Sequence, residues 1–294
     1  MMRAVLSSGS AGVVVADVPW PEPGHHQVLV RVSAAGVNPV DVDAGRTGPF
    51  DRVLGWEAAG VAEAVGEDVR GVRVGDAVMG WTYWFSSGRG CQAQYCVLDA
   101  SEVSAAPRQV DAAQAATVPL NGSTAWQALL ELGVQPGESL LVMGAAGSIG
   151  GFAIDLAVGK GCEVWGVAAA RDADFVGARG AHFVDRADAL RGGGALPSGG
   201  VDAVLATAPV DEAWQTAVRP DGRFLSTVGQ TLPRTACGFL NAHPDAGQLG
   251  ELAQVVDSGE LRTRVAQRYP LADAVVAYAD AAAPAVRGRL VLTP

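Results

Sequence analysis

The stretch SLLVMGAAGSIGGFAIDLAV, residues 139–158, decides the fold of this chain. Its first five residues form a short, continuous apolar run, which is typical of a parallel strand buried on both faces. The glycine loop 144–150 follows with the spacing GxxGxxG, and residues 149–158 then predict a helix. Glycines at such a turn let the backbone approach a pyrophosphate, whose negative charge the helix N-terminus favours. The stretch therefore predicts a dinucleotide-binding loop, with a purely structural loop as the alternative.

The residues around this loop repeat the same alternation of strand and helix. Residues 123–132 predict a helix before it, with Ser123 as the N-cap. Short apolar runs at 163–169, 201–206 and 223–228 predict further buried strands. Such alternation predicts a doubly wound parallel sheet, which is the Rossmann architecture.

The first third of the chain has a different pattern. Short apolar or alternating segments, broken by proline and glycine, predict strands at 27–34, 58–65, 72–79 and 94–98. Few long helical patterns interrupt them, so a small antiparallel β-barrel is the natural solution.

The last part of the chain changes again, and it completes the expected domain division. It predicts a helix at 246–258, and strands at 264–269 and 289–292 around a helix at 272–282. We expect an α/β chain of two domains: a β-barrel domain formed by residues 1–117 plus 260–294, and a Rossmann domain formed by residues 118–259.

Composition excludes several classes of protein. The 294 residues are 49% apolar and 18% charged, as in a globular chain, and 31 acids against 21 bases give a net charge of −10. That balance argues against nucleic acid or an anionic membrane as a partner, because both need a basic face. Four cysteines do not make a disulfide scaffold. With no apolar leader and no apolar run of membrane-spanning length, we expect a cytoplasmic protein.

The end of the second predicted strand bears on the choice of cofactor. NAD sites usually place an acid there, to bond the ribose 2′-hydroxyl. This chain has Ala168, Ala169, Ala170 and Arg171 instead. Arg171 is suited to pair with a 2′-phosphate, so NADPH is favoured, unless Arg171 only solvates the loop.

Six segments, in order along the chain, resemble the medium-chain dehydrogenase/reductase superfamily, in its zinc-free quinone oxidoreductase branch. They are AAGVNPVD at 34–41, GWEAAGV at 55–61, VGDAV at 74–78, STAWQAL at 123–129, the glycine loop, and RGRLVL at 287–292. The resemblance implies a GroES-like barrel beside the Rossmann domain, and a homodimer. Together with the glycine loop it implies that the residues that bind the NADPH cofactor are Asn38, Thr124, Gly144, Ala146, Gly147, Ser148, Ile149, Gly150, Ala169, Arg171 and Arg289. Ala169 stands where many NADPH-binding relatives have serine.

The resemblance also implies that no metal takes part. Zinc enzymes of the superfamily use a cysteine and the histidine of a GHE motif, but here Trp56 replaces the histidine and Asn38 lies near the cysteine position. Cys91 and Cys96 are too isolated for a structural zinc site, which needs four ligands. Without a Lewis acid nothing stabilises an alkoxide, whereas reduction of a conjugated carbonyl leaves a delocalised oxyanion that hydrogen-bond donors can hold.

Three residues are candidates for the catalytic centre, each with a structural alternative. Asn38 is expected to bond the nicotinamide ribose or the substrate oxygen, unless it only forms the turn before Pro39. Thr124 is expected to touch the nicotinamide, unless it only begins a helix. Tyr83, in the aromatic segment 81–85, is expected to donate a proton, although a packed aromatic is its default role.

The sequence thus predicts an NADPH-dependent oxidoreductase that transfers hydride to a small conjugated carbonyl substrate, a quinone or an α,β-unsaturated ketone. Two alternatives stay open. One is an enoyl reductase acting on a polyketide-type intermediate. The other is a non-catalytic, crystallin-like protein that binds a dinucleotide without turnover. The residues do not identify the substrate.

Overall fold

A computed structural model describes residues 1–9, 12–48, 52–189, 196–210, 212–229, 237–283 and 286–294. The chain forms two compact units. The first contains Met1–Ser123, His243–Gly259 and Thr263–Pro294, and the second contains Thr124–Ala242 and Glu260–Arg262. Among the described residues, no helix is long and apolar enough to cross a membrane.

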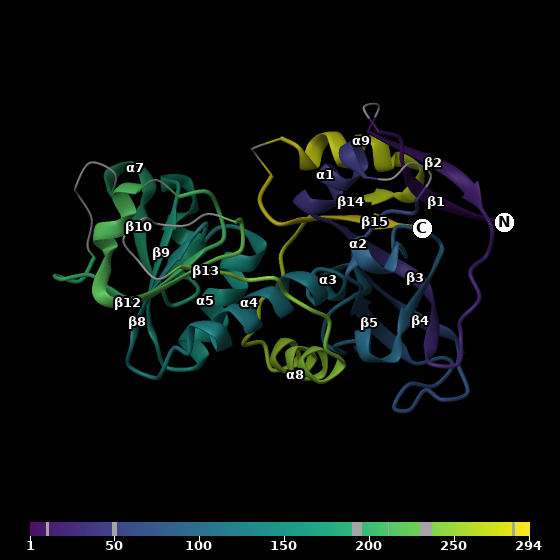
Figure 1. Ribbon diagram of the computed structural model, residues 1–294, viewed down its shortest axis with the longest axis horizontal. Coiled ribbons are helices and arrows are strands. Elements are labelled where there is room, and N and C mark those ends of the chain that lie inside the picture. The colour runs from purple at the N-terminus through teal and green to yellow at the C-terminus, as the bar shows by residue number, and fades with distance from the viewer. Residues whose placement is uncertain (10–11, 49–51, 190–195, 211, 230–236, 284–285) are drawn as a thin grey trace. The chain divides into compact units, whose positions relative to one another are not determined.

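The second unit is built on a six-stranded sheet in which every strand pair is parallel (Figure 1). Its strands are β8 (Ser139–Met143), β9 (Glu163–Ala168), β10 (His182–Asp185), β11 (Val201–Ala206), β12 (Val218–Ser226) and β13 (Cys237–Phe239), in the order β10-β9-β8-β11-β12-β13. This order is that of a doubly wound dinucleotide-binding sheet, so the predicted fold class is confirmed. Leu140 and Leu141 are fully buried, as a central strand covered on both faces requires.

Helices cover this sheet. Helix α5 (Ser148–Gly159) packs against β8 and β9, and α6 (Ala173–Gly177) packs against β9 and β10. Helix α7 (Arg186–Ala189) is a single turn after β10. Helix α4 (Pro119–Leu132) begins earlier than predicted. The expectation that Ser123 caps it is wrong: Ser123 lies inside the helix, and its hydroxyl accepts a hydrogen bond from the Trp81 indole at 3.2 Å.

The strands of the first unit are mostly antiparallel, as predicted. A hairpin joins β1 (Met2–Ser7) and β2 (Val13–Val18). The larger sheet contains β3 (Gln27–Val37), β4 (Glu57–Val65), β5 (Ala77–Trp81), β6 (Tyr95–Asp99), β7 (Val103–Ala105), β14 (Val265–Pro270) and β15 (Arg289–Thr293). Its path is β14-β15-β3-β4-β5-β7, with β6 also on β3, and only β14 and β15 pair in parallel.

One predicted strand of this unit was placed too early. The segment 72–79 was expected to be a strand, but β5 begins only at Ala77. The Asp76 carboxylate accepts a hydrogen bond from the Arg73 N–H at 2.8 Å, and Gly75 has φ of 92°, which closes a turn there. The apolar Val72 and Val74 therefore lie in a turn and not in the sheet.

Five helices are described in the first unit: α1 (Pro39–Thr47), α2 (Trp84–Ser87), α3 (Ala112–Ala115), α8 (Ala246–Asp257) and α9 (Ala274–Ala281). Figure 1 shows α9 beside β14 and β15, which it contacts. Helix α8 packs on β5 and β7, with Leu249 and Leu252 fully buried. The Rossmann domain predicted from the sequence, residues 118–259, includes α8. The compact units instead place α8 with the first unit, on whose strands it packs.

Candidate functional site

A buried polar network occupies the part of the first unit where β3, β4 and β15 begin or end. Asn38 follows β3, Glu57 opens β4 and Arg289 opens β15, while Asn121 lies in α4. Pairing of Val37 with Leu290 and of Ala35 with Ala58 brings these strand ends side by side. The four side chains are buried, Glu57 completely. Segments far apart in the sequence therefore supply one enclosed group of polar atoms.

The Glu57 carboxylate is the centre of this network. Its Oε1 accepts hydrogen bonds from the side-chain amides of Asn38 at 2.8 Å and Asn121 at 3.1 Å. Its Oε2 accepts from the backbone N–H of Leu120 at 2.8 Å. A Cβ at position 36 would lie 2.5 Å from Oε1, so only glycine fits beside the carboxylate. The glycine of AAGVN is thus explained by the acid that it faces.

Arg289 supplies the positive charge of the network. Its guanidinium donates to the carbonyl oxygen of Val37 at 3.0 Å and to Oδ1 of Asn121. Burial lowers the pKa of Arg289, while the nearby charge of Glu57 opposes that change. Burial also raises the pKa of Glu57, and Arg289 opposes that change in turn. Each of the two charges therefore depends on the other, because an unpaired ion at this depth is costly.

Asp41, in the first turn of α1, is a second buried acid beside this network. One carboxylate oxygen accepts a hydrogen bond from the backbone N–H of Asn38 at 2.7 Å. The other oxygen is buried, with no hydrogen-bond partner in the described part of the chain. Burial raises the pKa of Asp41 from 3.8 to about 7, and the negative charge of Glu57 adds to the rise. Asp41 therefore takes up its proton close to neutral pH.

This raised pKa predicts a pH-dependent stability. Between the ordinary value of 3.8 and about 7 the folded chain holds a proton on Asp41 that the unfolded chain has lost. Folding stability is therefore lost as the pH rises through this window, by up to about 1.4 kcal/mol per pH unit from this group. Asp41→Asn should flatten the dependence, measured by urea unfolding at several pH values across the window.

The matched control removes a carboxylate from the other side of the same helix. Asp43 lies on the exposed side of α1, so Asp43→Asn should keep the slope of the unaltered chain. An Asp41→Asn variant whose unfolding free energy falls with pH as steeply as that of the unaltered chain would contradict the assignment.

An aromatic cluster lies close to the network in sequence and in the fold. The Trp56 ring is 5.1 Å from Tyr83, 5.3 Å from Phe85 and 6.4 Å from Trp81, measured between centroids. Trp56 is buried, and its indole N–H has no partner among the described residues. Tyr83 is half-buried and Phe85 is 54% exposed, so the cluster reaches the surface of its unit. The aromatic segment 81–85 thus packs together with Trp56.

In the second unit, the glycine loop has the geometry that close approach of a phosphate needs. Gly144 ends β8 with φ of 79°, a conformation that favours glycine. A Cβ on Gly150 would lie 2.3 Å from the Gly144 carbonyl oxygen. Helix α5 starts directly at Ser148, and the N–H groups of a first helical turn have no acceptor within the helix. The loop also lies where the strand order reverses, at the carboxyl ends of β8 and β11.

The residues after β9 include one exposed arginine. Ala169 is half-buried, and Arg171 is exposed in the single turn that follows the strand. Asp172, the next acid along the chain, is buried with 4% of its surface exposed. Arg171 is therefore the exposed charge that comes first after β9, and the exposed acid Asp174 follows three residues later.

The structure brings some of the predicted site residues together. Asn38 and Arg289 share one network, and the residues from Gly144 to Gly150 share one loop with Ala146 and Ile149 half-buried and Gly147 exposed. Thr124 is buried in α4 with 7% exposed. Sequence reasoning missed Glu57, Asn121 and Asp41. A signal for Glu57 was present, because an acid between Trp56 and two alanines interrupts an otherwise apolar run.

Comparisons with known proteins agree with this arrangement. Residues 24–108 match the model of the alcohol dehydrogenase GroES-like domain, and residues 173–292 match that of the zinc-binding dehydrogenase family. The quinone oxidoreductase from Coxiella burnetii has a similar structure, with a TM-score of 0.89 at 27% identity over 100% of this chain and 99% of that one.

Two curated relatives are similar over shorter parts of their own length. The spectinabilin polyketide synthase system protein NorB of Streptomyces orinoci is 33% identical over 91% of this chain and 13% of its own. The quinone oxidoreductase of Homo sapiens is 34% identical over 63% of this chain and 58% of its own. The chain thus spans about half, or much less, of these curated relatives.

The donor set does not fit a catalytic zinc. The resemblance places Asn38 near the cysteine position of the zinc enzymes and Trp56 at their histidine position, and neither an amide nor an indole is a zinc ligand. The Asn38 amide is also committed to Glu57 and Asn121. No catalytic step is therefore assigned to a metal at this position.

Proposed function

The chain belongs to the medium-chain dehydrogenase/reductase superfamily, and on that premise we propose that it is an NADPH-dependent reductase of conjugated carbonyl compounds. The observation that carries the proposal is the replacement of the zinc ligands by Asn38 and Trp56. Reduction of a simple ketone would form an alkoxide that nothing at this position stabilises. A quinone or an enone gives a delocalised oxyanion, for which hydrogen-bond donors suffice.

Most of the residues that would hold NADPH lie in the second unit. The first-turn N–H groups of α5, at Ser148, Ile149 and Gly150, would donate to the pyrophosphate, which Gly144 and Gly147 allow to approach closely. Arg171 would pair with the 2′-phosphate beside Ala169. When bound, the nicotinamide supplies the hydride.

The residues that would handle the substrate include Asn38, Thr124 and Tyr83. An asparagine amide has two N–H donors, and one of those of Asn38 is bonded to Glu57. The second would serve the nicotinamide ribose or the substrate oxygen, with Glu57, Asn121 and Arg289 fixing its direction. Tyr83 or water would protonate the reduced substrate, and Trp56 and Phe85 would pack against a flat acceptor.

An enoyl reductase acting on a polyketide-type intermediate is the second candidate. The observation that favours it is the 33% identity to a polyketide synthase system protein over 91% of this chain. The same donor set serves this reaction, because hydride addition to an enoyl thioester also leaves a delocalised oxyanion.

Anaerobic NADPH oxidation by the purified chain, with quinones, 2-enones and enoyl thioesters as acceptors, tests both candidates. We expect turnover with one acceptor class and a preference for NADPH over NADH. Replacing Arg171 by alanine should raise the Kd for NADPH about tenfold or more and leave that for NADH unchanged, because one charge-assisted contact is lost. Arg186→Ala, an exposed arginine of α7, is the matched control.

Two other outcomes would contradict parts of the proposal. Tight NADPH binding with no acceptor reduced would identify a dinucleotide-binding protein without turnover. If Arg171→Ala loses affinity for NADPH and NADH equally, Arg171 does not pair with the 2′-phosphate. We also propose a homodimer, which the molar mass measured by light scattering checks.

A further inference from the structure

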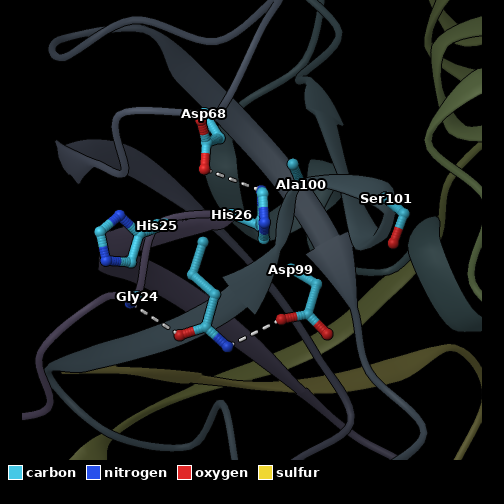
Figure 2. Close-up of a pocket in the computed structure, with 8 residues that line it drawn as sticks. Gly24, His25, His26, Asp68, Asp99, Ala100 and Ser101 are labelled. Carbon is cyan, nitrogen blue, oxygen red and sulfur yellow. Dashed lines mark hydrogen bonds and ion pairs between the residues drawn. The ribbon is translucent and has the colours of Figure 1, made fainter.

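A group of metal-ligating side chains lies in the first unit, apart from the network around Glu57. The Nδ1 or Nε2 of His25 and one carboxylate oxygen each of Glu67 and Asp68 lie within 4.8 Å of one another. His25 Nδ1 is 2.6 Å from Glu67 Oε1, and the adjacent His26 Nδ1 is 3.5 Å from Asp68 Oδ2. Figure 2 shows His26 and Asp68 facing each other, with His25 beside them. In the described part of the chain, no other three such residues gather in this way.

The backbone holds these side chains together. The loop before β3 carries the histidines, and the turn after β4 carries the acids. The Asp68 N–H donates to the His25 carbonyl at 3.0 Å, and the Gly66 N–H donates to the Gln27 carbonyl at 2.9 Å. A Cβ at Gly66 would lie 2.3 Å from the His25 carbonyl oxygen, so the two segments are in direct contact. The fold therefore places the segment of His25 directly beside the segment of Glu67 and Asp68.

We propose that His25, Glu67 and Asp68 form a binding site for a zinc-like divalent cation. One imidazole nitrogen with two carboxylate oxygens is a donor set suited to Zn²⁺, Co²⁺ or Ni²⁺, whereas Mg²⁺ and Ca²⁺ prefer oxygen alone. Zinc bonds of about 2.0–2.2 Å place neighbouring tetrahedral ligands roughly 3.3 Å apart. The distance between His25 Nδ1 and Glu67 Oε1, now 2.6 Å, must increase by less than about 1 Å to reach this value. Water would complete the coordination.

The surroundings of the site support entry of an ion. The side chains of His25 and Glu67 are 71% and 73% exposed, so the ion reaches them from water. The site borders an open pocket of about 900 Å³, whose lining includes His25, Asp68 and Asp99 (Figure 2). Asp99 is bonded to Gln27 at 2.8 Å and to Arg89 at 2.9 Å, so it is no ligand. The chain's net charge of −10 favours cations near its surface.

Zinc titration of the full chain by isothermal calorimetry tests the proposal. We expect one high-affinity site, weakened at least about tenfold by His25→Ala and by Glu67→Gln, since each removes a ligand. Zinc should raise the Tm of the unaltered chain and not that of His25→Ala, because a ligand that binds only the folded chain stabilises it. Cobalt bound there should show visible bands without a thiolate charge-transfer band.

A matched control is present in the second unit. His182 lies 3.2 Å from Glu163 in a similarly exposed pair, but the residues that the structure describes supply no third ligand beside them. His182→Ala should therefore keep the zinc affinity of the unaltered chain. Zinc affinity that survives His25→Ala, or that is lost in His182→Ala, would overturn the proposal, as would the absence of binding. The calorimetry, the Tm measurement and the cobalt spectrum all need neither NADPH nor turnover, so their results are independent of the proposed function.

Discussion

Replacing Arg289 with methionine should lower the free energy of unfolding by about 3–5 kcal/mol, because it leaves Glu57 as an uncompensated charge in a buried site. Asn121 and the Val37 carbonyl would lose their donor as well. Urea unfolding followed by tryptophan fluorescence measures the effect. Arg46→Ala, an exposed arginine of α1, should change the free energy by no more than about 0.5 kcal/mol.

A double variant separates lost charge pairing from lost packing. Glu57→Gln keeps the shape of the side chain and removes its charge, so Arg289→Met should cost less in that background. The double variant should therefore lose clearly less free energy of unfolding than the two single variants lose together. If the two changes are additive, the charge of Glu57 contributes nothing to the effect of Arg289, which then acts through packing and through its hydrogen bonds to Val37 and Asn121.

Alanine at position 150 should weaken NADPH binding at least about a hundredfold, the equivalent of roughly 2.8 kcal/mol. The added Cβ would lie 2.3 Å from the Gly144 carbonyl oxygen and 2.9 Å from the Ala145 Cα, both backbone atoms. Helix α5 must therefore move away from the loop, and its first-turn N–H groups move with it. The same clash should cost about 1–3 kcal/mol of stability.

The same helix provides the control. A Cβ at Gly159 would meet nothing within 4 Å, so Gly159→Ala should keep both stability and NADPH affinity. Fluorescence titration with NADPH gives the two dissociation constants, on samples shown to be folded by circular dichroism. A folded Gly150→Ala variant that binds NADPH as tightly as the unaltered chain would show that the dinucleotide lies elsewhere.

Much of the second unit could be predicted from its sequence. Strands β8 and β11 have the predicted limits, because a strand buried on both faces is a mostly apolar run: β8 is followed by Gly144, and β11 is interrupted only by Asp202 near its start. The segment 72–79 shows where this reasoning fails. Its valines have the composition of a strand, but Gly75 at positive φ and the bond between Asp76 and the Arg73 N–H make it a turn.

The candidate site could be predicted only in part. The glycine loop is a local motif, so residues 144–150 were identified from the sequence. The network around Glu57 is not local: positions 38, 57, 121 and 289 meet only after the strands pair. Nothing beside Arg289 in the sequence indicates that it is buried against an acid, so it was expected only as a contact of the cofactor. That contact remains a prediction.

The position of β15 at the end of the chain has a consequence for folding during synthesis. Ribosomes deliver a chain from its N-terminus at about 5–20 residues per second, so Glu57 is made roughly 10–50 s before Arg289. Residues 124–242 of the second unit leave the ribosome in that interval. The second unit can thus form most of its sheet while the first unit still lacks β14, β15 and the guanidinium that opposes the buried charge of Glu57. The first unit can therefore be completed only after all residues of the second unit have been synthesised.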